Sequence, residues 1–425
     1  MSPFYFGWLR WIMVYNSSIR YIDDSLFIDG IDLASIVRQV STPTYIYSLK
    51  RVGENYRRIR EAFAPLAAQI HFSVKANGNL AILRSLSRAG AGFDCVSAGE
   101  IDRCLRAGAP AQDIVFAGVG KTRAEIAFAV SAGIGWFNVE NLAELHYINS
   151  SADDLGVDAV KVALRLNPQV TANTHPYMAT GHGAAKFGLT ADVIRDILTR
   201  QSDYPRLSIA GIHIHIGSQL GDTAATLAAL DAALDLLAAH PRIRTINLGG
   251  GLPVAYRAHD AQPSLGDLVS ELIPRLAGYD VLLEPGRSIV ADAGLLVAEL
   301  LYVKRQAGQV FYIIDASMAE LIRPALYDAH HEVAPLRKTD REPVVAQVVG
   351  PVCESADVLA RDRELPALQA GDHVALMTAG AYGMSMASNY NARPRPAEVV
   401  VSESGDNWRV SRRRETFDDL AQSDK

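Results

Sequence analysis

The 425-residue sequence contains only three cysteines, Cys95, Cys104 and Cys353. Three cysteines cannot build the disulfide framework of a small secreted domain, and they favour a reducing compartment such as the cytoplasm. The sequence also lacks a surplus of basic residues, because 41 Lys and Arg stand against 47 Asp and Glu, a net charge of −6. A chain without a basic excess has little with which to neutralise phosphates, so we expect no nucleic-acid partner.

Long apolar runs are absent as well, since no stretch reaches the roughly 20 residues that a membrane span requires. The aromatic stretch at residues 1–18 is interrupted by Arg10, and it lacks the basic start and the small-residue cleavage site of a signal peptide. We therefore expect no association with a membrane. Residues 1–21 are interpreted as an N-terminal extension in which Met13 offers an alternative start, and the polar residues 411–425 as a tail.

Short β-branched or aromatic runs alternate with helical patterns between residues 70 and 287. The runs interpreted as strands are HFSVKA, GFDCVS, IVFAG, WFNVE, AVKVALRLN, IAGIHIHIG, TINLGG and DVLLEPG. Between them, apolar residues recur at three- and four-residue steps, and glycine often closes the pattern, as is typical of helices. Eight strand–helix units predict an α/β fold, a (β/α)8 TIM-like barrel over residues 48–290, and an open doubly wound sheet is the alternative.

The sequence pattern changes after residue 295, where strand-like runs follow one another without helices of similar length. These runs are LLVAELLYVKR, QVFYIIDAS, PVVAQVVGP, HVALMTAGAY and AEVVVS. We therefore predict a β-rich domain over residues 291–410. Residues 22–47, with RYIDDSLFIDGI at their start, are expected to add strands to that domain, and a helix is expected from Ser48 onward.

Chemically reactive residues stand at the ends of the predicted strands. In a (β/α)8 barrel the active site forms where the carboxyl ends of the strands and their loops converge. The residues expected to lie together there are Lys75, Asp94, Arg165, His213, His215, Ser218, Gly249, Gly250, Gly251, Glu284, Gly286 and Arg287. Any one of them alone is more often a satisfied polar residue or a turn glycine, but six strand ends that carry such groups favour a common site.

These residue types together describe a site for pyridoxal phosphate. A lysine that follows a buried strand can be desolvated, lose its proton and act as an amine nucleophile. Three consecutive glycines let backbone N–H groups approach a phosphate, and Ser218 adds a short donor. A carboxylate can hold a heterocyclic nitrogen protonated, and an imidazole can stack on the ring. No set of metal ligands is assigned.

The chain resembles the diaminopimelate decarboxylases, which belong to the fold-type III pyridoxal phosphate enzymes together with ornithine decarboxylase and alanine racemase. The resemblance covers residues 22–405. It rests on motifs that follow the family's order: FSVKAN, FDCVSAGE, THPYMATG with KFGL, HIHIGSQ, NLGGG, EPGR, RPALYDA, GPVCESAD and GAYGMSMASNYN. His175, in THPYMATG, fits the family but has no assigned role.

The resemblance implies a role for each residue of the predicted site. Lys75 would carry the cofactor covalently, His215 would stack on its ring, and Glu284 would face the ring nitrogen. The other residues implied to bind the cofactor are Asp94, Arg165, Ser218, Gly249, Gly250, Gly251, Gly286, Arg287 and Tyr382. The resemblance also implies a homodimer with shared active sites, in which the partner subunit delivers Cys353 and Glu354.

The resemblance further implies a decarboxylation. Alanine racemases of this group place an arginine at the ring nitrogen and use a catalytic tyrosine, and neither replacement is found here. Cys353 is the expected proton donor, although a cysteine is more often a small buried hydrophobic residue. Arg323 and Tyr327, with Arg287, would bind a second carboxylate, because an arginine fork matches a carboxylate.

The expected substrate is an amino acid, meso-2,6-diaminopimelate, whose decarboxylation gives L-lysine and CO2 in the last step of lysine biosynthesis. Glu354 would pair with its distal ammonium group, and Tyr382 would also contact it. The segment DASMAE, residues 315–320, and Ala356 depart from the family pattern. Another diamino or carrier-linked amino acid in specialised metabolism is therefore an alternative substrate. An inactive homologue that carries pyridoxal phosphate is a further alternative, against which the presence of Lys75 and Cys353 argues.

Overall fold

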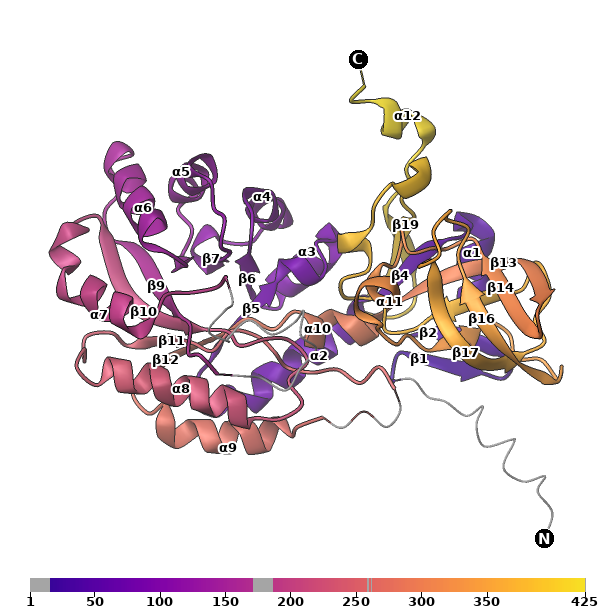
Figure 1. Ribbon diagram of the computed structural model, residues 1–425, viewed down its shortest axis with the longest axis horizontal. Coiled ribbons are helices and arrows are strands. Elements are labelled where there is room, and N and C mark those ends of the chain that lie inside the picture. Colours follow the sequence, from indigo (N-terminus) through magenta and orange to yellow (C-terminus); the bar gives the residue numbers. More distant parts are fainter. Residues whose placement is uncertain (1–15, 171–185, 258–259, 261, 425) are drawn as a thin grey trace, which may run out of the picture. The chain divides into compact units, whose positions relative to one another are not determined.

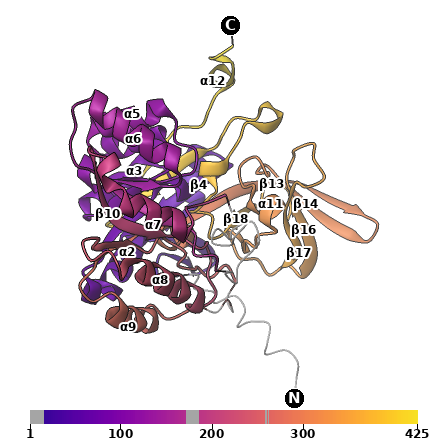
Figure 2. The same cartoon turned by 60° about the vertical axis from the view of Figure 1, so that its left-hand side comes forward.

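The computed structural model (Figures 1 and 2) describes residues 16–170, 186–257, 260 and 262–424. Most of the predicted N-terminal extension and the THPYMATG segment with His175 lie outside the described residues. The chain forms two compact units. The barrel unit contains Asn55–Ala255 and His259–Ile289, and the β unit contains the residues up to Glu54, Tyr256–Ala258 and the residues from Val290 onward. Within the described ranges, no helix combines the length and apolar character needed to cross a membrane.

Eight parallel strands form a closed barrel in the barrel unit, because the last of them pairs with the first. In chain order they are β5 (Gln69–Ser73), β6 (Gly92–Cys95), β7 (Ile114–Phe116), β8 (Trp136–Val139), β9 (Val160–Leu166), β10 (Leu207–Ile214), β11 (Thr245–Asn247) and β12 (Asp280–Leu283). Each lies within or overlaps one of the eight predicted runs. The prediction of a (β/α)8 barrel is confirmed, and closure excludes the open sheet.

A helix follows each barrel strand, and Figure 1 shows α3 to α9 arranged around the strands. The helices are α2 (Leu49–Ala62), which precedes the barrel, and then α3 (Leu80–Arg88), α4 (Ala98–Ala107), α5 (Arg123–Ala132), α6 (Leu142–Asp154), α7 (Ala191–Thr199), α8 (Ala224–Leu237), α9 (Leu265–Arg275) and α10 (Arg287–Val290). Local sequence explains their ends. Thr122 and Glu125 form a capping box at the start of α5, and Gly133 ends that helix with a φ of 67°.

The register of the barrel strands brings polar residues from different segments to one level. His213 of β10 stands opposite Arg165 of β9 on one side and Asn247 of β11 on the other. In the same way Ser73 of β5 stands opposite Asp94 of β6. The barrel therefore gathers, toward the carboxyl ends of its strands, side chains that are far apart in the sequence.

Among its described residues, the β unit contains two sheets and three short α-helices, apart from the start of α2. An antiparallel sheet consists of β1 (Ile19–Ile22), β2 (Ser25–Ile28) and β3 (Ile31–Asp32). A nine-stranded sheet consists of β4 (Thr44–Ser48), β13 (Gly294–Gln306), β14 (Gln309–Ile314), β15 (Val333–Pro335), β16 (Pro343–Val349), β17 (Val358–Pro366), β18 (His373–Leu376), β19 (Ala397–Val401) and β20 (Trp408–Arg412). The helices are α1 (Leu33–Val40), α11 (Arg323–Tyr327) and α12 (Phe417–Ala421). Figure 2 shows β14, β16 and β17 side by side. The predicted β-rich domain is confirmed.

The N-terminal residues contribute to the β unit in two ways. β4 pairs with β13 on one side and with β19 on the other, inside the large sheet. The small sheet packs into the same hydrophobic core, where Ile19, Leu26 and Ile28 join Val297 and Val399. The strand β1 begins within residues 1–21, which were predicted to form an extension, and α12 lies within residues 411–425, which were predicted to form a tail.

Candidate active site

Lys75 and Asp94 form an ion pair where β5 and β6 end. Lys75 Nζ lies 2.8 Å from Asp94 Oδ2, and the Asp94 side chain is fully buried whereas 37% of the Lys75 side chain is exposed. Ser73 Oγ lies 2.7 Å from the same oxygen and 2.9 Å from the carbonyl oxygen of Glu284. Desolvation was named above as a way to make this amine a nucleophile. In the structure the Lys75 side chain is partly exposed, and its amine pairs with the buried Asp94.

Glu284 is held by three side chains inside the barrel. Its Oε1 accepts hydrogen bonds from the amides of Asn138, at 2.7 Å, and Asn247, at 2.6 Å. Its Oε2 lies 3.2 Å from Nε2 of the buried His213. These contacts fix the plane of the carboxylate, because the three side chains reach its two oxygens from three different strands.

The same surroundings determine the charge of Glu284. Burial alone would raise the pKa of this carboxyl group. The charge and hydrogen bond of His213, the charge of Lys75 and the amide of Asn247 outweigh burial and hold the pKa well below its usual range. Glu284 is therefore an anion inside the barrel, as a partner for a protonated ring nitrogen must be.

His215 follows β10 and is held as a neutral imidazole. The backbone N–H of Gly250 donates to His215 Nδ1 at 3.2 Å, which requires a lone pair on that nitrogen. Burial, together with the charges of Arg165, Lys75 and His213, lowers the pKa of His215 well below its usual range. A neutral ring with fixed orientation is suited to stacking on an aromatic ring.

Arg165 supports the loop that carries His215. Its Nη1 lies 2.5 Å from Glu140 Oε1, and both side chains are buried. Its Nη2 donates to the carbonyl oxygen of His215 at 3.5 Å, and the centroid of the Phe187 ring lies 4.6 Å from the guanidinium carbon. The contacts of Arg165 are therefore made to residues of the barrel unit itself.

The Gly249–Gly251 loop lies against its neighbours so closely that side chains do not fit. A Cβ atom on Gly249 would lie 2.6 Å from the carbonyl oxygen of Ile214, and one on Gly250 would lie 2.4 Å from that of Glu284. Gly249 and Gly251 also have φ values of 68° and 106°, which favour glycine. The N–H of Gly249 donates to Asn247 Oδ1 at 2.9 Å. The loop is therefore a bare backbone surface beside Glu284 and His215.

Two further predicted residues lie at the end of β12. The Nε of Arg287 donates to Ser218 Oγ at 3.2 Å, and Arg287 is 7% exposed. A Cβ on Gly286 would lie 2.9 Å from the Cβ of Ser73 and 3.0 Å from that of Ala76. Gly286 thus permits close packing against the turn η4 (Val74–Ala76), which carries Lys75.

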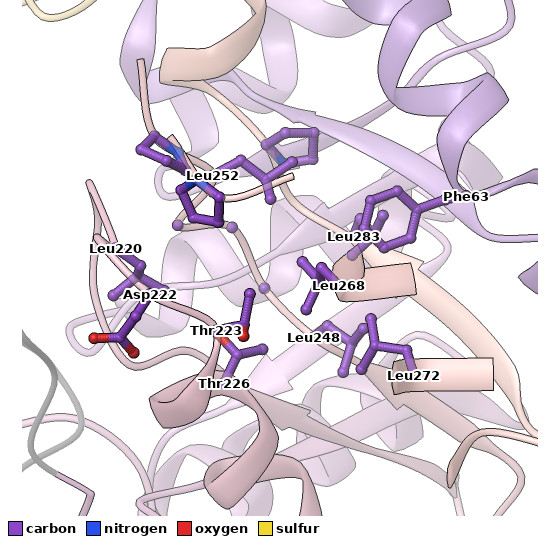
Figure 3. A pocket seen from close by; sticks show the side chains of 16 residues that line it. Phe63, Leu220, Asp222, Thr223, Thr226, Leu248, Leu252, Leu268, Leu272 and Leu283 are labelled. Carbon is purple, nitrogen blue, oxygen red and sulfur yellow. The ribbon is translucent and has the colours of Figure 1, made fainter. Parts of the chain in front are cut away.

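The Gly249–Gly251 loop forms part of the wall of an apolar pocket. Figure 3 shows this pocket from close by. It encloses about 500 Å³, part of it open to solvent, and its wall includes Leu248, Leu268, Leu272, Leu283 and Phe63. Neither Lys75 nor Glu284 lines it. The pocket therefore provides apolar surroundings for the glycine loop, and it is not a site for the charged groups of an amino acid.

The remaining predicted residues belong to the β unit. Cys353 is exposed, in contrast to the buried Cys95 and Cys104. Its N–H donates to Asn391 Oδ1 at 2.9 Å, while the buried Asp357 accepts from the N–H of Val352 at 2.8 Å. The segment around Cys353 is thus folded around Asp357, and Cys353 itself stays exposed. This exposure argues against the alternative that Cys353 is a small core residue.

The substrate-binding candidates of the β unit lie on three separate segments. Arg323 begins α11 and is 4% exposed, whereas Tyr327 ends the same helix and is partly exposed. Tyr382 is partly exposed and has a φ of 55°, a left-handed conformation that bulky residues rarely adopt. Glu354 is exposed, next to Cys353.

Comparison with known proteins identifies the family. Residues 49–291 match the pyridoxal binding domain of the pyridoxal-dependent decarboxylases. The diaminopimelate decarboxylase of Pseudomonas aeruginosa is 45% identical over 410 residues, which cover 95% of this chain and 97% of that protein. That of Aquifex aeolicus is 40% identical over 411 residues, covering 95% and 96%. The structure of diaminopimelate decarboxylase from M. jannaschii with L-lysine has a TM-score of 0.91 and 36% identity, covering 97% of this chain and 99% of the other.

The chain belongs to the diaminopimelate decarboxylase family. Membership implies pyridoxal phosphate as the cofactor, and the barrel residues fit this group. The bare glycine loop, the anionic Glu284 and the amine of Lys75 supply the contacts that a phosphate, a ring nitrogen and an aldehyde require. Asp94 Oδ1 and Asn138 Oδ1 are buried with no hydrogen-bond partner among the described residues. Both oxygens can therefore still accept a hydrogen bond.

Several residues of the site were not predicted from the sequence. Asn138, Asn247 and Ser73 are polar residues within otherwise apolar strands, and they orient Glu284 and Asp94. Their position in buried runs was a usable signal, because a buried polar group must find a partner. Glu140, the partner of Arg165, carried a similar signal at the end of the run WFNVE.

Proposed function

We propose that this protein is a pyridoxal phosphate-dependent carboxy-lyase that converts meso-2,6-diaminopimelate to L-lysine and CO2, the last step of lysine biosynthesis. The observation that carries the proposal is the buried Glu284 carboxylate, which three side chains hold as an anion close to the Lys75–Asp94 pair. The relative from Pseudomonas aeruginosa is a diaminopimelate decarboxylase, and the similar structures of diaminopimelate decarboxylase from Helicobacter pylori and M. jannaschii contain L-lysine.

Within this proposal, the barrel residues hold the cofactor and tune its chemistry. Pyridoxal phosphate, when bound, supplies the electron sink that accepts the electron pair left by the departing carboxylate. Lys75 would hold the cofactor covalently, and the Gly249–Gly251 loop with Ser218 would bind its phosphate. Glu284 would keep the ring nitrogen protonated through its fixed negative charge, and an arginine at that position could not do so. The neutral His215 would stack on the ring without competing for that proton.

The β unit residues would recognise the substrate. Arg323, assisted by Tyr327 and Arg287, would bind the carboxylate at the distal end of the substrate, and Glu354 would bind the distal ammonium group. Tyr382 would contact cofactor and substrate. A ligand that has both an amine and a carboxylate at its far end matches this set, whereas ornithine has no distal carboxylate to offer Arg323.

Cys353 would deliver the proton that replaces the departing carboxylate. Its exposure makes the thiol available to a ligand, and a cysteine can act as a general acid. We infer that it comes from a second copy of the chain, so that the working form is a homodimer with shared sites. The three thiols without a disulfide among them fit the cytoplasm, which we propose as the location.

The test is a panel of diamino acids with defined stereochemistry, assayed for CO2 release by the purified holoenzyme. We expect turnover of meso-2,6-diaminopimelate to L-lysine, with little turnover of ornithine or lysine. Turnover of a different diamino or carrier-linked acid instead would contradict the substrate. A protein that binds pyridoxal phosphate but releases no CO2 from any member of the panel would be a carrier and not an enzyme.

A further inference from the structure

Arg323 is fixed by a histidine of the same unit. Its Nη1 lies 2.9 Å from Nε2 of His331, and the two side chains are buried, with exposures of 4% and 0%. The other ring nitrogen of His331, Nδ1, lies 2.8 Å from the carbonyl oxygen of Met377. A histidine eight residues beyond the arginine thus links α11 to the segment that follows β18.

The two partners determine the protonation of His331. A carbonyl oxygen only accepts hydrogen bonds, so Nδ1 must carry hydrogen. A guanidinium only donates and stays protonated, so Nε2 must offer its lone pair. An imidazolium would place a second donor and a second positive charge 2.9 Å from Arg323. His331 is therefore a neutral imidazole in one defined tautomer.

A neutral acceptor has a different effect on Arg323 than a carboxylate would have. A carboxylate would orient the guanidinium but would also cancel most of its charge toward a ligand. His331 orients it and adds no negative charge. The ring of Tyr256, with its centroid 4.5 Å from the guanidinium carbon and 5.6 Å from the centroid of the His331 ring, restrains the group in the same way.

We propose that His331 is a positioning residue which, by holding Arg323 through a neutral acceptor, makes the site selective for ligands with a carboxylate at the distal end. This inference rests on the proposed function, in which Arg323 binds that carboxylate. It adds that the selectivity depends on the charge of the residue at position 331 as well as on Arg323. Replacing the neutral acceptor by an anionic one should preserve the contact and abolish the selectivity.

The neighbouring His330 provides a matched control. Its Nδ1 lies 2.8 Å from Arg363 Nη2, and its Nε2 lies 3.2 Å from Glu332 Oε2. Arg363 also donates to the carbonyl oxygen of His331 at 3.3 Å, so it faces the backbone of His331 and not its ring. A glutamate introduced at position 330 therefore changes the local charge equally but faces Arg363 instead of Arg323.

The experiment compares two ligands that differ only in the distal carboxylate. L-Lysine keeps that carboxylate and cadaverine lacks it, while both offer an amine to the cofactor. Their dissociation constants for the holoenzyme are measured by calorimetry and by the change in cofactor absorbance, without turnover. For the wild-type protein we expect L-lysine to bind about ten- to a hundredfold more tightly than cadaverine, as for a hydrogen-bonded charge pair.

The variants separate positioning from simple packing. H331Q supplies one neutral acceptor and one donor, as the imidazole does, and should recover the preference for L-lysine. H331E should reduce the preference at least about tenfold, because the introduced carboxylate would pair with Arg323. H331M, which offers no comparable acceptor, should also reduce it, and it decides the question if H331E does not fold. H330E should keep the preference. A structural role alone would predict that H331E, with its new ion pair, binds L-lysine as well as H331Q does.

The outcomes distinguish the two levels of the proposal. If the wild-type protein binds L-lysine and cadaverine equally, the assignment of Arg323 in the proposed function fails. If the wild-type protein discriminates but H331E and H331M discriminate equally well, the inference about His331 is overturned while the proposed function stands. Loss of preference in H330E to the same extent as in H331E would overturn it too, since the effect would then be one of general charge.

Discussion

Glu284 is the residue on which the contacts of the barrel interior converge. Asn138, His213 and Asn247 reach it from three different strands, and the Lys75 amine acts on it electrostatically. Sequence reasoning predicted Glu284 itself, because it ends a strand in a recognisable motif. It did not predict the two asparagines, because their partner becomes visible only when the strands are brought into register.

Replacing Glu284 by glutamine separates charge from shape. The glutamine side chain could still accept hydrogen bonds from the two asparagine amides. The negative charge beside the ring nitrogen of the cofactor would be lost. We expect kcat to fall about 100- to 1000-fold, as when one preorganised electrostatic group is removed. Cofactor binding, measured by absorbance titration of the apoprotein, should change little because the phosphate contacts remain. An E284Q variant with unchanged kcat would show that the charge of Glu284 is not used in the reaction.

At the scale of elements, the start of α4 contains a carboxyl group, that of Glu100, whose charged form is disfavoured by burial. Glu100, in the first turn of α4, accepts a hydrogen bond from the N–H of Val96 at 2.8 Å. Burial raises the pKa of its carboxyl group to about 7, with a further contribution from Asp94, although the Val96 N–H and the charges of Lys75 and Arg103 oppose the shift. The fold therefore holds a proton on Glu100 that the unfolded chain releases near pH 4.5.

This shift predicts how stability depends on pH. Between about pH 4.5 and 7 the native state binds the extra proton, so the free energy of unfolding falls as the pH rises through this window. An E100Q variant loses that dependence, and its stability relative to wild type should improve by roughly 2 kcal/mol between pH 5 and pH 8. Denaturant unfolding at the two pH values measures the difference.

The matching residue of the next helix should behave in the opposite way. Glu125 of α5 accepts from the N–H of Thr122, and this contact, with the other hydrogen bonds it receives, lowers the pKa of its carboxyl group. Its stabilising effect is present above its unfolded pKa, so E125Q should lose more stability at pH 8 than at acidic pH. If E100Q and E125Q respond to pH with the same sign, the electrostatic account of these helix starts is wrong.

Elements were predicted well where the local pattern was strong. All eight barrel strands lie within or overlap apolar runs that are bounded by turns. Barrel formation buries each of these runs even where the run and the strand end at different residues. β4 was not identified as a separate strand, although the segment was expected to join the β-rich domain. Its pairing with β13 and β19 joins residues that are about 250 and 350 positions away, a long-range contact that no local pattern specifies.

At the scale of the whole molecule, the predicted site residues are divided between the two units. Lys75 and Glu284 belong to the barrel unit, whereas Cys353 and Arg323 belong to the β unit. The short segment Tyr256–Ala258 is assigned to the β unit although the chain on both sides of it belongs to the barrel unit. The sequence does not indicate that this segment belongs to the β unit, because the segment has neither a periodic pattern nor a motif. For the same reason, the contact between the Tyr256 ring and Arg323 was not predicted.

Sharing of sites between copies can be tested by complementation. K75A and C353A each inactivate their own homodimer in the proposed function. If Cys353 acts in the site of the partner subunit, a mixed dimer contains one intact site, and random association should restore about a quarter of the wild-type activity. Unmixed K75A and C353A samples at equal total concentration are the controls. Mixed dimers that stay inactive, once their formation is verified by tagged purification, would show that each copy uses its own cysteine.

The central claim is that the Lys75 amine holds pyridoxal phosphate covalently, and borohydride reduction followed by peptide mapping tests it most directly. Lys121 is an internal control, because its buried Nζ already contacts Glu144 Oε1 at 2.6 Å and two carbonyl oxygens. We expect the pyridoxyl group on the peptide that contains Lys75, and none on the peptide that contains Lys121. A reduced holoenzyme whose Lys75 peptide is unmodified, or whose label lies on another lysine, would contradict the claim.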